Sequence, residues 1–191
     1  MKLVNSLALA GILGLSTLYG ANYNVDIGHS HIGFKVKHMM ISNVRGDFKK
    51  FSGTFVVNEK TKHISSINGI VQVASLTTQN AQRDKDLKNS AFFDVKKYPT
   101  MKMKLIKQDG DKATLELTIK DVTKTIEMNI EDINGPVKDP WGYTRMAFEL
   151  HGQINRKDFH MNFNKLLETG GLLVGDKVKI DISIEGTRGK Q

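Results

Sequence analysis

The stretch Lys177–Glu185, KVKIDISIE, alternates between polar and apolar side chains without a break. Val178, Ile180, Ile182 and Ile184 therefore point to one side of an extended chain, and the residues between them point to the other side. Alternation with a period of two is typical of a β-strand that has one apolar face and one face in water. The same pattern recurs along most of the chain.

Seven further stretches alternate in this way, and turns of hairpin length such as Asp109-Gly110 separate most of them. Together they predict eight antiparallel strands. Gly46 and Gly53 fall inside these stretches, as is common in sharply curved sheets. The sequence therefore predicts an all-β protein whose eight strands close into an up-and-down barrel, with a two-sheet sandwich as the alternative. The seven stretches are 23–38, 44–57, 64–76, 101–106, 112–119, 126–131 and 143–154.

One stretch, Thr78–Pro99 (TQNAQRDKDLKNSAFFDVKKYP), does not alternate. Thr77 and Thr78 are usable helix N-caps, a dense charged run follows, and the final proline prevents a helix from continuing. We therefore expect a short helical insert that covers one end of the barrel. Because consecutive residues of an extended chain point to opposite faces, we expect one ring of Phe92-Phe93 in the lumen and the other packed under the insert.

The first 21 residues have the features of a secretory signal peptide. Lys2 supplies a positive charge, and Leu7–Leu18 is an apolar run too short for a comfortable membrane span. We interpret residues 1–21 as a leader that directs the protein to the periplasm, and residues 22–191 as one barrel domain. An uncleaved anchor is the alternative. No cysteine follows the apolar run, which excludes a lipoprotein anchor.

The composition excludes several kinds of site and favours one class of partner. The chain has no cysteine, so thiol catalysis, thiolate metal sites and iron–sulfur clusters are excluded. Lys2 is the one charged residue of the leader, so 27 basic and 20 acidic residues remain without it, a net charge of +7. This balance favours peripheral contact with an anionic membrane, although it could serve solubility alone. We expect no nucleic-acid partner for an exported protein.

The inward faces of the predicted strands are rich in methionine and phenylalanine. Methionine adapts its shape to irregular apolar partners, so a wall of such residues suits a long aliphatic chain. A solid core that happens to contain methionine is the alternative. If the lumen is hollow, we expect its ligand to contact Phe34, Val36, His38, Phe48, Phe55, Phe92, Met101, Met103, Met128, Met146 and Phe148.

Motifs in three parts of the chain share their order and spacing with a known family. They are His29-Ser30-x-Ile32-x-Phe34, His38, Gly46-x-Phe48 and Phe51-x-Gly53; then Thr78-x-Asn80, Arg83-Asp84-x-x-Leu87, Phe92-Phe93-Asp94 and Lys97-Tyr98-Pro99; and finally Val174-Gly175-Asp176-x-Val178-x-Ile180. This set resembles the YceI-like family over essentially the whole chain after the leader. The resemblance implies an extended, lipocalin-like antiparallel barrel of the periplasm that holds an isoprenoid or similar long-chain amphiphile in its lumen, without a cofactor.

One position departs from the family pattern. Where that pattern has Arg-x-Asp-Phe-Gly, this chain has Arg156-Lys157-Asp158-Phe159-His160. A bulky, titratable side chain thus replaces glycine. The family's loop geometry and ligand fit therefore do not carry over directly to this position.

Three charged residues are candidates for the entrance of the barrel. Arg83 and Asp84 belong to the insert, and we expect Arg83 to bond to Asp84, to Asp94 or to backbone near the mouth. A planar, permanently charged guanidinium there could also meet an anionic headgroup, and Arg156 is a second candidate for that role. The alternative for Arg83 and Asp84 is a solvated helix face.

The histidines suggest a second class of function. His29 and His31 could bind a metal with a third ligand from His38, His151 or His160, as in a periplasmic hydrolase or redox protein. However, the strand phase places His29 and His31 opposite the inward face that carries His38. The chain also has no HExxH, GxSxG or CxxC motif. We therefore assign no catalytic or metal-binding residue and expect a binding protein rather than an enzyme.

The sequence leaves two further alternatives open. The protein could act as an adaptor between other proteins of the envelope. An unpaired strand edge could also join two copies of the chain into a homodimer.

Overall fold

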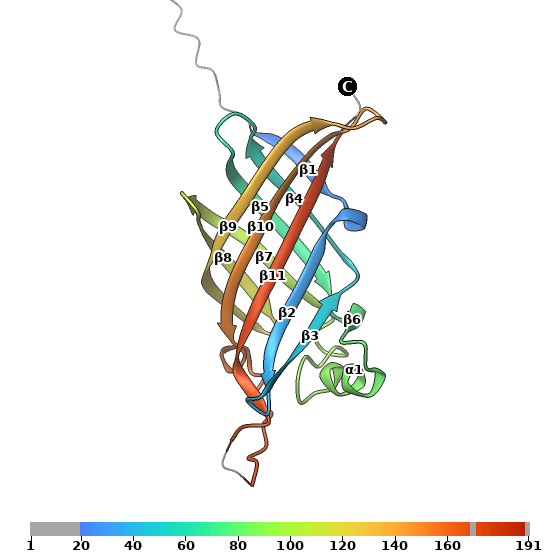
Figure 1. Ribbon diagram of the computed structural model, residues 1–191, viewed down its shortest axis with the longest axis vertical. Coiled ribbons are helices and arrows are strands. Elements are labelled where there is room, and N and C mark those ends of the chain that lie inside the picture. The colour runs from blue at the N-terminus through green and yellow to red at the C-terminus, as the bar shows by residue number, and fades with distance from the viewer. Residues whose placement is uncertain (1–19, 169–170, 190–191) are drawn as a thin grey trace, which may run out of the picture.

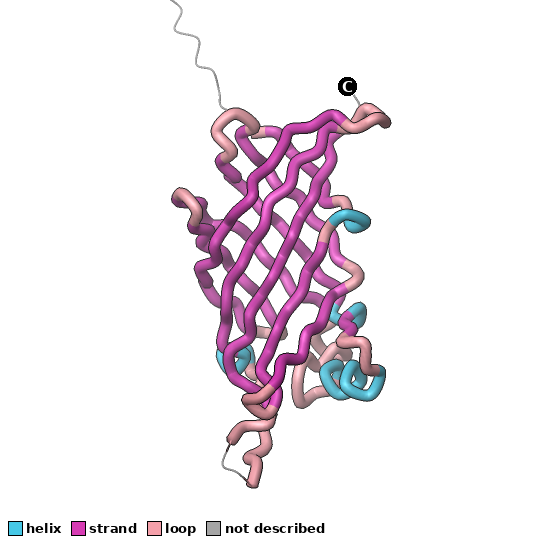
Figure 2. The backbone as a smooth tube through the Cα atoms, viewed as in Figure 1, coloured by secondary structure: helices cyan, strands magenta, loops and turns pink. Residues whose placement is uncertain are grey.

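A computed structural model describes residues 20–168 and 171–189. They form one antiparallel barrel with short helices at its rim (Figures 1 and 2). Its strands are β1 (Ala21–Val25), β2 (His31–His38), β3 (Ser42–Phe48), β4 (Phe51–Asn58), β5 (His63–Gln72), β6 (Leu76–Thr77), β7 (Thr100–Asp109), β8 (Lys112–Ile119), β9 (Val122–Lys138), β10 (Thr144–Asn155) and β11 (Val174–Arg188). The helix is α1 (Ala81–Lys88), and the 3-10 turns are η1 (Ile27–His29), η2 (Val73–Ser75) and η3 (Arg156–Phe159).

The predicted eight-stranded antiparallel barrel with a short helical insert is confirmed. The strand order is β1-β4-β5-β7-β8-β9-β10-β11-β2-β3-β6, and an additional β1–β11 pairing closes a ring of eight strands. Eleven strands are counted because three long strands are interrupted, at η1, at Lys49-Lys50 and at η2. Both halves of the first long strand pair with β11, through Asn24↔Thr187 and His31↔Ser183. The sandwich alternative is therefore wrong.

The predicted leader falls mostly outside the described residues, which begin at residue 20. Ala21, the last residue of the predicted leader, begins β1 and pairs with Val57 of β4. Cleavage after Ala21 would therefore remove only the first residue of that strand. Among the described residues, no helix combines the length and the apolar character needed to cross a bilayer.

The inward side chains form two clusters along the barrel. The first cluster centres on Tyr23, Phe55 and Phe148, in which Phe55 stacks on Tyr23 at 5.2 Å and meets Phe148 edge-on at 5.0 Å. Gly186 makes room for this stack, because a Cβ there would lie 2.4 Å from Phe55. The second cluster lies near α1 and includes Phe48, Val73, Leu76, Met101, Leu117, Ile119, Ile154, Phe159 and Met161.

Tyr23 has an unusual environment for an ionisable group. Its side chain has no exposed surface, and its hydroxyl donates a 2.5 Å hydrogen bond to Glu59 Oε1. Arg188 holds the same carboxylate at 2.8 Å. Burial, followed by the hydrogen bond to Glu59, raises the pKa of Tyr23 from 10.0 to about 12.

This raised pKa predicts a loss of stability at alkaline pH. The folded protein keeps the Tyr23 proton up to a pKa of about 12, whereas the unfolded chain releases it near pH 10. The stabilisation is therefore complete below about pH 10 and is lost between about pH 10 and 12, by about 2–3 kcal/mol. Over that pH range, the free energy of unfolding measured in urea should fall more steeply for the wild type than for Tyr23→Phe, a variant that keeps the ring but lacks the hydroxyl. Parallel curves for the two proteins would show that the hydroxyl is not involved.

The helical insert begins later than the sequence indicated. Asn80, not Thr77 or Thr78, is the N-cap of α1, and its side-chain oxygen accepts from the backbone N–H of Arg83 at 2.9 Å. Thr78 is buried and serves a different purpose, as an anchor for Arg83 and Asp84. The cap therefore lies two residues beyond Thr78, closer to the charged run. The helix packs beside β6 at one end of the barrel (Figure 1).

Candidate ligand-binding cavity

The barrel encloses an almost wholly apolar cavity of about 170 Å³. It extends from the inner surface of the first cluster to the second cluster and the insert. Strands β2, β4, β5, β7 and β11 contribute most of its wall, and other strands and η3 add a few residues each. The insert contributes Leu87, Phe92 and Phe93 at the lower part. The lumen is therefore hollow along part of its length and solid elsewhere.

Eight of the predicted lumen residues lie on the wall of this cavity. They come from strands on both sides of the lumen and from the insert, so the inward phase deduced from alternation holds around the ring. These residues are Phe34, Val36, Phe48, Phe55, Phe92, Met101, Met103 and Phe148. Their contact with a ligand stays a prediction.

Three predicted lumen residues do not line the cavity. Met128 and Met146 point inward, but both are buried in the first cluster, with exposed fractions of 1% and 2%. Met128 lies over Gly152, where a Cβ would come within 2.6 Å of its Cγ. His38 is the last residue of β2 and is half-buried at the strand end. Alternation predicts which side chains of a strand point inward, but not where along the barrel axis the interior is hollow.

Phe92 and Phe93 both line the cavity, so the expectation that they point to opposite sides is wrong. Phe93 meets Phe48 edge-on at 5.9 Å, and Phe92 packs against Phe163 at 5.0 Å. The reason is that the chain turns here instead of extending: the N–H of Phe93 bonds to the Leu87 carbonyl and that of Phe92 to the Asn89 carbonyl. Alternation does not apply to a turn.

Two facing glycines are the site residues that sequence reasoning missed. Gly53 of β4 pairs directly with Gly69 of β5, and both lie on the cavity boundary. A Cβ on Gly69 would meet nothing within 4 Å. Its inward neighbours in phase, Ile67 and Val71, also line the cavity. Glycine in phase with inward residues was the available signal. The missing side chain of Gly69 adds to the hollow space, whereas Gly53 lets the two strands approach, because a Cβ there would lie 2.6 Å from the Asn68 carbonyl oxygen.

Arg83 and Asp84 do not reach the cavity. Arg83 donates from Nε to Thr78 Oγ1 at 2.8 Å and from Nη2 to the Thr78 carbonyl at 2.9 Å. Asp84 accepts from the backbone N–H and the hydroxyl of Thr78 at 2.7 and 2.5 Å. Burial opposes the charge on Asp84, but these hydrogen bonds outweigh it and lower the pKa of the carboxyl. The pair holds the turn between β6 and α1. Of the bonds expected for Arg83, the one to backbone is present, at the Thr78 carbonyl, whereas among the described residues Arg83 makes no bond to Asp84 or Asp94.

Arg156 does lie on the cavity boundary, but its guanidinium is committed to the protein. It is 3% exposed and donates to the carbonyls of Gly175, Met161 and Val174. It also pairs with Asp176 at 3.1 Å. Burial lowers the pKa of Arg156, and the charge of Asp176 opposes this effect. Arg156 therefore joins η3 to the start of β11.

His160, the departure from the family pattern, takes the backbone conformation that glycine would favour. Its φ is 57° and its ψ is 28°, in the left-handed region, at the C-cap of η3. The ring lies 3.2 Å from Asp121, and Lys120 donates to the His160 carbonyl at 3.1 Å. The turn is thus retained with histidine, and the side chain lies at the surface rather than in the cavity.

Of the histidines proposed as a metal set, His31 and His151 line one polar surface depression, but among the described residues the set does not gather into a common ligand group. His31 lies 3.5 Å from Asp47, and His151 lies 2.9 Å from Glu149. Within the described residues, the group with metal-ligand spacing is Asp26, His29 and Glu185. His29 and His31 therefore do not share a site, and the metal-hydrolase alternative has no geometric basis in the predicted set.

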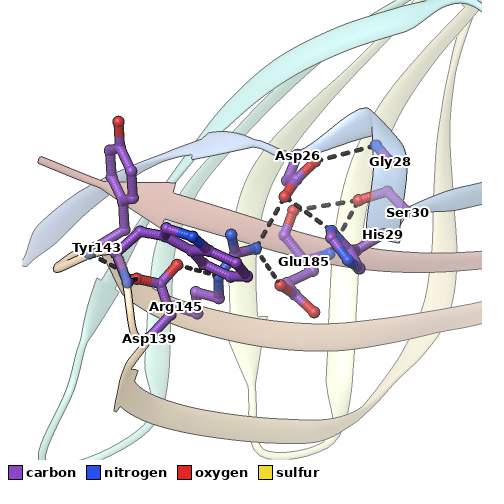
Figure 3. A network of polar contacts seen from close by, with 9 residues as sticks. Asp26, Gly28, His29, Ser30, Asp139, Tyr143, Arg145 and Glu185 are labelled. Atoms are coloured by element: carbon purple, nitrogen blue, oxygen red, sulfur yellow. Dashed lines mark hydrogen bonds and ion pairs between the residues drawn. The ribbon is translucent and has the colours of Figure 1, made fainter.

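Arg145 already occupies the centre of that acidic group (Figure 3). Its guanidinium lies 2.8 Å from Asp26, 2.6 Å from Glu185 and 2.8 Å from Asp139. These hydrogen bonds, led by that of Asp26, raise the pKa of Arg145, and Arg145 lowers the pKa of Asp26. The guanidinium supplies the charge that a metal ion would bring. The network joins β10, β11 and η1 where the barrel closes.

The whole chain can be compared with known proteins. The pattern that defines the YceI-like domain matches residues 23–186. UPF0312 protein plu2095 of Photorhabdus laumondii is 38% identical over 185 residues, which cover 94% of this chain and 93% of that protein.

Solved structures show the same likeness. The Campylobacter jejuni YCEI protein has a TM-score of 0.67 at 30% identity, over 81% of this chain and 90% of its own. A polyisoprenoid binding domain from Saccharophagus degradans has a TM-score of 0.64 at 13% identity, over 87% of this chain and 98% of its own, which is a likeness of fold alone. On the extent of the domain match and of the sequence identity, the chain belongs to the YceI-like family.

Proposed function

We propose that this protein binds one long-chain apolar or amphiphilic lipid, such as an isoprenoid, inside its barrel and carries it through the periplasm without catalysing a reaction. The observation that carries the proposal is the apolar cavity, with its glycine pair and its cover of aromatic residues from the insert. Such a cavity offers water almost no hydrogen-bond partners, but its polarity matches that of an alkyl or isoprenoid chain.

The size of the cavity supports a chain rather than a small molecule. One water needs about 10–15 Å³ on the same scale, so about 170 Å³ holds roughly a dozen water-sized groups. A methylene is similar in size to a water molecule. Each buried methylene contributes about 0.8 kcal/mol, so a chain of roughly a dozen carbons could bind tightly after its ordering cost is subtracted.

Three further points support the proposal. The cavity boundary includes Arg156, but the guanidinium of this residue is engaged by backbone carbonyls and Asp176. The Saccharophagus degradans neighbour is described as a polyisoprenoid binding domain, which is the same class of ligand. The leader-like residues 1–21 are the basis for export to the periplasm.

A chain-length series tests the proposal. Saturated amphiphiles with one headgroup and chains of about eight to eighteen carbons should displace an apolar fluorescent probe from the protein. We expect the dissociation constant to fall about fourfold per methylene, the equivalent of about 0.8 kcal/mol, until the chain fills the cavity near a dozen carbons. Affinity should then change little with length. Affinity that is independent of chain length throughout the series would contradict binding in the lumen.

A further inference from the structure

The lower end of the barrel in Figure 1 carries an exposed apolar tip, formed by Met39, Met40, Ile41 and Leu166. Their exposed fractions are 38%, 54%, 82% and 78%. The first three residues form the β2–β3 turn, and Leu166 lies in the loop that leads to β11.

Backbone hydrogen bonds hold the two parts of the tip together. The Met39 N–H bonds to the Leu173 carbonyl at 2.9 Å, and the Leu173 N–H bonds to the Lys165 carbonyl at 3.0 Å. Leu166 bridges to Leu172 in the same loop. The apolar side chains therefore belong to one continuous end of the molecule.

The backbone of the tip makes its residue types unexpected. Met39 and Met40 have φ values of 50° and 62°, in the left-handed region where glycine and asparagine are favoured. A tight turn in water thus carries two large apolar side chains in a conformation that costs them free energy. Departures from local rules of this kind are expected at functional surfaces.

A basic band surrounds the tip. Its members are cations on the outer faces of β2, β3 and β11 and in the loop before β11: Lys35, Lys37, Arg45, Lys165, Lys177 and Lys179. Lys35 pairs directly with Arg45 on one side and with Lys179 on the other, and like charges placed opposite one another are unfavourable. Among the described residues, none of the six side chains makes an ion pair.

Few negative charges offset this band. Asp176 is already engaged by Arg156 and Lys157, at 3.1 and 2.8 Å. Glu168 of the loop is exposed, and Asp47 and Asp181 lie beside the band, one residue pair further up the sheet. The lower end therefore combines a row of unpaired cations with an apolar tip, which is the arrangement that anionic lipid surfaces recognise.

The tip adjoins the lower end of the cavity. His38, the residue before Met39, pairs with Val174, which lines the cavity. Phe92, another lining residue, packs on Phe163 in the chain segment that carries Leu166. The tip therefore adjoins residues that line the lower end of the cavity.

We propose that this end docks on an anionic bilayer, with the apolar tip in the interface and the basic band against lipid phosphates. The other end of the barrel has exposed Val137 and Trp141, but Asp139 lies between them in the chain and engages Arg145. Docking at the lower end would place the cavity beside the lipid from which its ligand comes. Only this purpose rests on the proposed function, since the docking itself does not require an occupied cavity.

Sedimentation with lipid vesicles tests the proposal, using protein recovered from the envelope of producing cells. Vesicles of phosphatidylglycerol with phosphatidylethanolamine should bind the protein, and vesicles of phosphatidylcholine should not. The tip variant combines Met39→Asn, Met40→Gly, Ile41→Thr and Leu166→Ser, with residues that suit left-handed positions at the turn. We expect it to lose affinity for anionic vesicles more than about tenfold.

The band variant combines Lys37→Gln, Lys165→Gln and Lys177→Gln. It should lose affinity by more than about tenfold at low salt and show a weaker salt dependence than the wild type. Matched controls carry Val137→Thr with Trp141→Ser at the other end, and Lys60→Gln in the β4–β5 turn with Lys104→Gln and Lys107→Gln on β7. Both controls should stay within about twofold of the wild type.

Two outcomes would overturn the docking proposal. The first is a wild type that does not bind anionic vesicles, as expected if the tip binds a protein partner instead. The second is an equal loss of vesicle affinity in the tip variant and in its control. Displacement of the apolar probe, measured on the same proteins, separates this proposal from the proposed function. Vesicle binding without probe binding would support the docking proposal and contradict the proposed lipid carrier. Probe binding without vesicle binding would support the carrier and contradict docking.

Discussion

Gly69→Phe is expected to weaken lipid binding by about a hundredfold or more while leaving the barrel folded. The position faces the lumen between Ile67 and Val71, and its Cβ would meet nothing within 4 Å. A phenyl ring there fills space that at least about four ligand methylenes would otherwise occupy. At about 0.8 kcal/mol each, their loss weakens binding by about a hundredfold or more. Phenylalanine also favours strands, so the variant should be no less stable than the wild type.

Gln72→Phe is the matched control for this substitution. It places the same ring on the same strand, at an exposed position that does not line the cavity. Probe displacement should give wild-type affinity for the control, and urea unfolding should show both variants folded. Wild-type affinity in Gly69→Phe would mean that the ligand lies elsewhere.

Arg156→Met is expected to cause the largest loss of stability among the substitutions considered. The methionine keeps much of the apolar stem but leaves the carbonyls of Gly175, Met161 and Val174 without their donor. Each buried acceptor left unpaired costs about 1–3 kcal/mol, and some regain water, so we expect a total loss of about 3 kcal/mol. The free energy of unfolding in urea measures this loss.

Lys157→Met separates the buried guanidinium from the ion pair. Lys157 holds the same Asp176 carboxylate at 2.8 Å, but its side chain is 43% exposed. Exposed pairs contribute little, so this variant should lose at most about 1 kcal/mol. Equal losses in the two variants would show that the carboxylate, rather than the three carbonyls, determines the role of Arg156.

The strands and their faces could be predicted because each is set by local alternation. KVKIDISIE forms part of β11, and its Ile180, Ile182 and Ile184 all line the cavity as the period of two requires. The interruptions at η1 and η2 could not be predicted in the same way, since each depends on pairing with distant strands. At η1 the pairing along β11 passes from β1 to β2, and at η2 the chain leaves β4 and β7, the partners of β5, for β3, the partner of β6. Closure of the ring is a long-range property that single stretches do not contain.

The limits of the cavity were harder to predict than its face. Met103 and Met146 follow the same inward pattern, yet Met103 lines the cavity and Met146 is enclosed by the first cluster. Both pair with a glycine on the neighbouring strand, Met103 with Gly69 and Met146 with Gly186. The space over Gly69 is open, whereas Phe55 fills the space over Gly186. Such volumes depend on several strands at once.

The polar residues show the same limit. The charges of Arg83 and Arg156 suggested the same role for both, contact with an anionic headgroup at the entrance. In the structure, Arg83 bonds to Thr78 and Arg156 is buried among backbone carbonyls. Arg145 drew no attention in the sequence, although it joins Asp26, Asp139 and Glu185 across the closure of the barrel. Its partners lie up to 119 residues away, so no local spacing could indicate them.

Native mass spectrometry of protein recovered from the cell envelope without detergent tests the central claim most directly. We predict that the wild type carries one apolar amphiphile per chain, which organic extraction removes, and that Gly69→Phe purified in parallel carries none. A wild type that shows only the mass of the bare chain and does not bind an apolar probe would contradict the claim that the cavity holds a lipid.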